Sequence, residues 1–133
     1  TLDVDSSSMP LFVRAGSVIP LADGAERASP DAERSRTLAV FPAQNDHDGV
    51  SLIYDDAGDN ADALDGNHCL TRVGIRSGSE AIDLRLRHEG RLAFPFEELR
   101  LCLPSGERRR VRIGTQWWDI DLAAMGRLRV RRG

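Results

Sequence analysis

Residues 82–87 read IDLRLR, in which apolar and charged side chains alternate strictly. Residues 99–103 read LRLCL and repeat this period of two. In an extended strand, alternate side chains lie on opposite faces, so each stretch predicts a strand with one core face and one solvent face.

The rest of the chain breaks every few residues at Gly, Pro, Asn or Asp, and the pieces between have the same short period. We expect eight further short strands, at residues 11–14, 18–21, 38–41, 51–54, 68–76, 110–113, 116–120 and 128–131. Strands throughout predict an all-β protein, an antiparallel β-sandwich of two small sheet domains.

Two polar segments interrupt this pattern. Residues 23–36 contain Pro30 and few apolar side chains, which predicts an exposed loop or a short helical turn. Residues 55–67 are rich in aspartate and are the best candidate for a boundary between two domains. We therefore expect a first domain at residues 1–54 and a second at residues 55–133.

The composition excludes several classes of function. A chain of 133 residues is far shorter than the ~250 residues of a (β/α)8 barrel. All 18 basic residues are arginine, but the net charge is -3 and no aromatic side chains are interleaved with Arg108, Arg110 and Arg112. We expect a solvated sheet face there and no nucleic-acid partner.

No stretch approaches the ~18 apolar residues of a membrane span, and the first residues lack the pattern of a secretion signal. The two cysteines, Cys69 and Cys102, are too few for a disulfide framework and are expected to stay unpaired. These features favour a cytoplasmic protein with no membrane contact.

Three stretches carry a family resemblance. Residues 9–21, MPLFVRAGSVIPL, and residues 51–58, SLIYDDAG, resemble two signatures of the β-sandwich region that follows the catalytic barrel in family 31 glycoside hydrolases. That family includes α-glucosidases and α-xylosidases. Residues 94–113 are similar to the distal strands of the same region, and the three matches together cover essentially the whole chain.

The resemblance implies a non-catalytic protein whose partner is the barrel of a retaining α-glycosidase, which it would stabilise while shaping the substrate entrance. It implies Arg14, Asp55 and Asp56 as candidates for the barrel contact. Arg14 has an alternative interpretation, in which it caps carbonyls inside the sandwich. Ala57 departs from the usual Asp-Gly turn of the second signature.

In the resembled family, an aromatic-rich hairpin usually comes before the first signature, and this sequence starts without it. We therefore expect the first domain to be incomplete. Residues 11–21 would then leave an unpaired edge or apolar face that could recruit a second copy of the chain.

The sequence predicts no catalytic residue, metal or cofactor. Retaining glycosidases need two carboxylates about 5 Å apart around the sugar, whereas Asp55 and Asp56 are adjacent and point to opposite sides of an extended strand. The aspartates between residues 46 and 62 do not have the spacing of a calcium-binding loop.

Trp117 and Trp118 are consecutive, so in a strand one faces the core and the other faces outward. An exposed tryptophan can stack on a sugar ring or cover a domain interface. The alternative function is therefore an independent carbohydrate-binding module, with Trp117 and Trp118 as the stacking candidates. A stand-alone hydrolase is a third hypothesis.

Overall fold

The structure is a computed structural model and describes residues 11–21, 35–56, 66–93, 96, 98–118 and 127–131. These residues form nine strands: β1 (Ser17–Leu21), β2 (Ser35–Phe41), β3 (His47–Asp56), β4 (His68–Ser77), β5 (Ala81–Glu89), β6 (Glu98–Cys102), β7 (Arg110–Ile113), β8 (Gln116–Trp118) and β9 (Arg127–Arg131). No helix is formed in the described residues, which confirms the predicted all-β class. The described residues therefore contain no helix that could cross a membrane.

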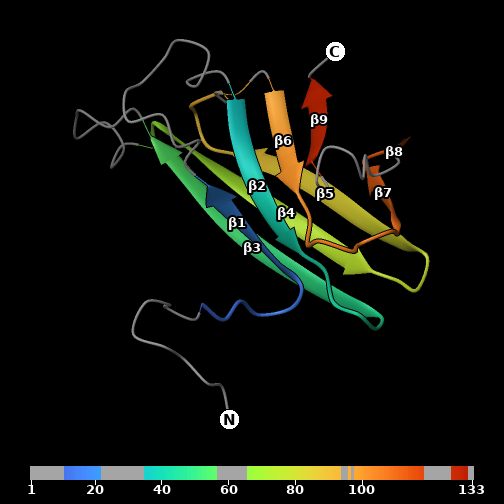
Figure 1. The fold of residues 1–133 in the computed structure, drawn as a ribbon. Coiled ribbons are helices and arrows are strands. Elements are labelled where there is room, and N and C mark those ends of the chain that lie inside the picture. Colours follow the sequence, from blue (N-terminus) through green and yellow to red (C-terminus); the bar gives the residue numbers. More distant parts are fainter. Residues whose placement is uncertain are drawn as a thin grey trace, which may run out of the picture.

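The strands are arranged in two sheets that lie one over the other (Figure 1). One sheet has the strand order β1-β2-β6-β9, and the other has the order β3-β4-β5-β7-β8. Five of the seven strand pairs are antiparallel. This is the predicted β-sandwich.

Two strand pairs are parallel, which the sequence did not predict: β2 with β6, and β5 with β7. After β5 the chain enters the other sheet as β6 and then returns as β7, so β7 runs in the same direction as β5. Between β2 and β6 the chain likewise passes through β3, β4 and β5 of the second sheet. In each parallel pair, the two strands are therefore separated along the chain by at least one strand of the opposite sheet.

A single hydrophobic cluster fills the space between the sheets. Ile82 and Leu84 of β5 are among its most buried members, as their alternation with charged residues predicts. The expected domain boundary after residue 54 falls inside β3, and the cluster takes residues from both sides of it. Its buried members are Val18, Leu38, Val40, Ile53, Val73, Ile75, Ile82, Leu84, Leu101, Leu103 and Val111.

One expected strand is not formed, and one expected loop ends earlier than predicted. Residues 11–14 do not form a strand, and Leu11 and Phe12 are about four-fifths exposed, at 79% and 80%. A turn at residues 15–16 separates them from β1, so they do not continue its pairing with β2. At the end of the polar segment, Ser35 and Arg36 belong to β2 rather than to a loop, while residues 22–34 lie outside the described part of the chain.

Candidate functional site

Residues 9–21, the first stretch that carries the family resemblance, cross β3 at a pair of glycines. Gly16 has a φ of +80°, and its amide donates to the carbonyl of Phe41 over 2.7 Å. A Cβ atom on Gly49 of β3 would lie 2.1 Å from the Gly16 carbonyl oxygen, and one on Gly16 would lie 2.5 Å from the ring of His47. The Gly16 carbonyl leaves no room for a side chain at Gly49, and the left-handed backbone at residue 16 favours glycine there, so the crossing depends on both glycines.

β3 carries three exposed apolar side chains on its outer face. Ile53 points into the core, whereas Val50, Leu52 and Tyr54 are 61%, 58% and 53% exposed. We call these three residues the apolar strip. The large hydrophobic residues exposed within the described chain all belong to the first segment or to this strip: Leu11, Phe12, Val13, Ile19, Leu21, Val50, Leu52 and Tyr54.

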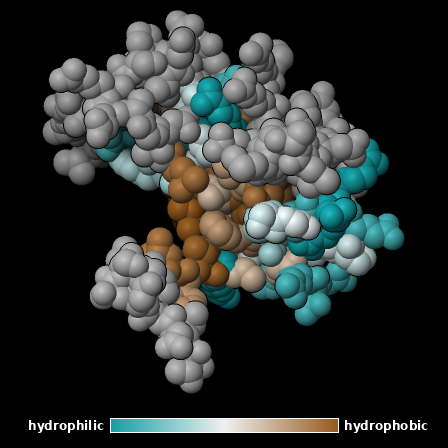
Figure 2. Space-filling view, viewed as in Figure 1, coloured by the Kyte–Doolittle hydropathy of each residue, from teal (hydrophilic) through white to brown (hydrophobic). Residues whose placement is uncertain are grey.

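Figure 2 shows hydrophobic residues gathered on the side of the molecule where β1 and β3 lie. β1 is an edge strand of its sheet, and the amide of Val18 donates to Ser51 Oγ of β3 over 2.8 Å. At this corner the two sheets are therefore joined by a hydrogen bond as well as by packing, while the apolar strip beside it stays open to solvent.

The three candidates for a barrel contact lie in different environments. Arg14 is exposed just before β1, and it makes no ion pair or hydrogen bond in the described part of the chain. Asp55 is partly buried, with a side chain 12% exposed, and it pairs with Arg36 of β2. The Arg36 guanidinium also lies 4.4 Å from the centre of the Phe96 ring, which adds a cation–π contact. Asp55 thus has a partner within the chain.

Asp56 ends the outer face of β3 beside the apolar strip. Tyr54 stacks on His68 of β4, with ring centres 5.3 Å apart and planes 25° apart. Partial desolvation, the negative charge of Asp56 and a hydrogen bond to it raise the pKa of Tyr54. Tyr54 therefore remains a neutral phenol at physiological pH, and it presents an amphipathic ring to solvent.

The two tryptophans are placed by the pairing of β8 with β7. Trp117 lies opposite Arg112, and Trp118 lies opposite Val111. Val111 belongs to the core, whereas Arg112 reaches Asp83 on the adjacent β5. The register therefore pairs Trp118 with a core residue of β7 and Trp117 with an outer one.

The opposite end of β3 leads into a polar network that the sequence analysis missed. We call it the loop end, which comprises the β2–β3, β4–β5 and β6–β7 connections. Arg109 donates to the carbonyls of Ala43 and Gly78 over 2.9 and 2.8 Å, and its Nη2 lies 2.7 Å from Glu107 Oε2. Both side chains are largely buried, at 15% and 11% exposed. Arg109 therefore ties all three connections together.

Glu107 is held in its ionised form by this network. The hydrogen bond from the Arg109 side chain lowers the pKa of Glu107 below its ordinary value, against the opposing effect of burial, and backbone amides at Arg108 and Arg109 add to the lowering. The sequence holds no signal for this role, because Arg109 is the middle residue of a run of three arginines, residues 108–110, that are alike until the connections are placed in space.

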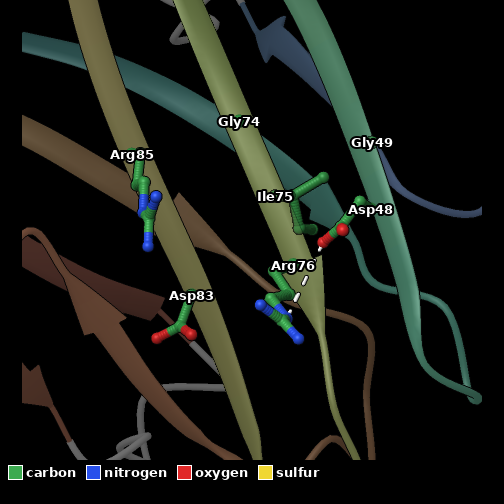
Figure 3. Close-up of a pocket in the computed structure, with 7 residues that line it drawn as sticks. All are labelled: Asp48, Gly49, Gly74, Ile75, Arg76, Asp83 and Arg85. Atoms are coloured by element: carbon green, nitrogen blue, oxygen red, sulfur yellow. Dashed lines mark ion pairs between the residues drawn. The ribbon is translucent and has the colours of Figure 1, made fainter.

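A shallow hollow lies on the outer face of the five-stranded sheet, above Gly74 in the middle of β4 (Figure 3). Its volume is about 240 Å³. Four charged side chains surround it: Asp48 from β3, Arg76 from β4, and Asp83 and Arg85 from β5. We call this feature the Gly74 hollow.

Unlike Gly49, Gly74 is not required by the packing around it. The nearest atoms to a Cβ added at Gly74 would be 3.8 and 3.9 Å away, which is ordinary contact. Its φ also lies outside the left-handed range. A larger residue would fit in this strand, so the fold alone does not account for the glycine.

The described residues contain no group of three His, Cys, Asp or Glu side chains arranged to hold a metal ion. Cys69 and Cys102 are both free thiols, as the sequence predicted, and Cys69 is buried. No protein-family model matches the chain, and no curated protein matches it.

Proposed function

We propose that this chain is a non-catalytic β-sandwich that packs against the catalytic barrel of a family 31 α-glycosidase, stabilises the barrel and shapes its substrate entrance. One observation carries the proposal. Seven of the eight large exposed hydrophobic residues of the described chain lie in residues 9–21 and 51–58, two of the stretches that resemble that family's sandwich, and the eighth, Val50, directly precedes the second of them. Apolar surface of this kind is unfavourable in water and is typical of an interface that a partner covers.

The proposal assigns the bond-breaking chemistry to the barrel. Asp55 and Asp56 lie on opposite faces of β3, and Asp55 is paired with Arg36. Two carboxylates that flank a sugar must instead face a common cleft. The exposed part of this surface, which a partner would cover, consists of Arg14, Asp56 and the apolar strip.

The test is a binding experiment with the barrel of a family 31 α-glycosidase from which its own C-terminal sandwich has been removed. We expect the chain to bind this barrel in calorimetric titration and to raise its melting temperature. The double variant Leu52→Ser/Tyr54→Ser removes most of the apolar strip and should weaken binding about tenfold or more, because two large contact side chains are lost.

Arg87→Ser is the matched control, since Arg87 is exposed on the outer face of the same sheet but lies on β5, away from the strip. Its affinity for the barrel should equal that of the wild type. Absence of binding by the wild-type chain, or equal binding by the strip variant, would reject the proposal.

A further inference from the structure

We infer that the Gly74 hollow is a binding site for a single neutral sugar ring. The inference does not rest on the proposed packing against a barrel. It starts from glycine in the middle of a central strand, which lowers stability because it adds backbone freedom to the unfolded chain and contributes no side-chain packing. In strands such a glycine often marks close approach by another group.

For Gly49 that group is inside the molecule, because the Gly16 carbonyl passes directly over it. For Gly74 no such group exists among the described residues, since an added Cβ would have only ordinary contacts. The space above Gly74 opens instead to solvent as the hollow in Figure 3. The lack of a side chain at Gly74 therefore leaves space for a ligand from outside the chain.

The two aspartates around the hollow do not require a cationic ligand, because each has an arginine partner. Asp83 already pairs with Arg112 over 2.8 Å, and Asp48 faces Arg76 at 3.9 Å. Both carboxylates are thus compensated, but each retains oxygens that can accept hydrogen bonds from hydroxyl groups.

Arg85 supplies the donors on the other side of the hollow. It is exposed and has no hydrogen bond or ion pair in the described part of the chain, so its guanidinium is free to donate to a ligand. A ligand that accepts from Arg85 and donates to Asp83 or Asp48 needs groups that are both donor and acceptor. Adjacent hydroxyl groups on a ring meet this requirement.

The margin and size of the hollow restrict the ligand further. Val50 does not line the hollow, but it lies beside it, directly across from Gly74 on β3, and is 61% exposed, so it could contact the C–H face of a bound ring at the margin. The volume of about 240 Å³ is below the ~300–1,000 Å³ of pockets for larger small molecules. A single pyranose ring is the matching class, held weakly because the site is shallow.

A second hollow, of about 520 Å³, lies at the loop end beside Glu107 and Arg109. Its two buried charged side chains are already occupied by each other and by the carbonyls of Ala43 and Gly78. Arg85 has no such internal role, and for this reason the Gly74 hollow is the stronger candidate.

The experiment is a titration of the isotope-labelled full chain with methyl α-glucopyranoside and methyl α-xylopyranoside, followed by amide NMR shifts. We expect saturable shifts at millimolar sugar that centre on Gly74 and Arg85. Arg85→Ala should weaken binding about tenfold through loss of a charged donor. Arg87→Ala, two residues along the same exposed face, should leave it unchanged.

Gly74→Val tests the glycine itself. The new side chain should fill the hollow and abolish binding, while packing against Val50 raises the melting temperature by about 2 °C. A lower melting temperature would mean that the fold needs this glycine, and the inference would then be wrong. It would also be overturned if neither sugar shifted these amides, if all variants responded equally, or if phosphate alone gave the same shifts.

This outcome is independent of the barrel experiment. The sugar titration uses the isolated chain and variants of β4 and β5, whereas the barrel experiment depends on the strip of β3. Either result can therefore fail without the other.

Discussion

At the loop end, charged side chains are buried and paired, whereas on the outer face of β3 apolar side chains are exposed. Arg109 and Glu107 satisfy each other and two backbone carbonyls, so that end needs no partner to be stable. Leu52 and Tyr54 gain little from their position in an isolated chain. We therefore expect the loop end to contribute to stability and the outer face of β3 to contribute to binding.

The largest effect should come from breaking the loop end. Arg109→Ala removes both hydrogen bonds to carbonyls and leaves the Glu107 carboxylate buried without its partner. We expect the free energy of unfolding to fall by about 3 kcal/mol, as for other pairs that lose one buried member. Urea denaturation measures it.

Arg108→Ala is the control for this change, because Arg108 is exposed and contributes only its backbone amide to Glu107. Its unfolding free energy should stay within about 0.5 kcal/mol of the wild type. Equal stability of the two variants would show that the loop end is not the stabilising region that we describe.

A smaller but clear loss should follow from a change on the β3 side. Gly49→Ala would bring a methyl group against the carbonyl oxygen of Gly16, at a starting distance of 2.1 Å, and the crossing segments must separate. We expect a loss of about 2 kcal/mol, typical of overpacking. Gly74→Ala, which meets only ordinary contacts one strand away, should not destabilise the chain.

This pair of glycine variants sharpens the comparison. If both variants unfold at the same urea concentration, the crossing of the two segments is looser than its geometry implies. A selective loss in Gly49→Ala would mean that the β3 side is tightly built even though its outer face is open.

The smallest effect concerns pH. Because the folded chain holds the pKa of Glu107 below its ordinary value of 4.5, the carboxylate stabilises the fold above that pH, and this contribution is lost as the pH falls through the lower, folded pKa. We expect Glu107→Gln to reduce the acid-dependent loss of stability by about 1 kcal/mol. Urea midpoints measured from neutral to acidic pH give this slope, and parallel curves for the two proteins would contradict the assignment.

The sequence predicted the strands whose two faces differ in polarity. In β5 and β6 the alternation identified Ile82, Leu84 and Leu101 as inward-facing, and all three are in the core. The prediction failed at residues 11–14, because an apolar stretch has no period that reveals whether a partner strand is present.

The polar partners could not be predicted in the same way. Arg36 reaches Asp55 across 19 positions of sequence, and Arg109 reaches Ala43 across 66. Such contacts depend on how the strands are ordered in the two sheets. The glycines have the same ambiguity, since Gly49 and Gly74 look alike in sequence and differ only in what lies above them.

The two parallel pairs also determine the order in which strands can pair while the chain is being synthesised. A nascent chain that has emerged through β5 can form the β3–β4–β5 meander, but β2 still lacks its central neighbour β6. The part of the inner face that β6 covers stays open until Leu101 is made, and the five-stranded sheet lacks Val111 until β7 follows. During synthesis, the meander therefore has a partly open apolar face after β5 has formed, and both sheets are completed only by strands that come later in the chain.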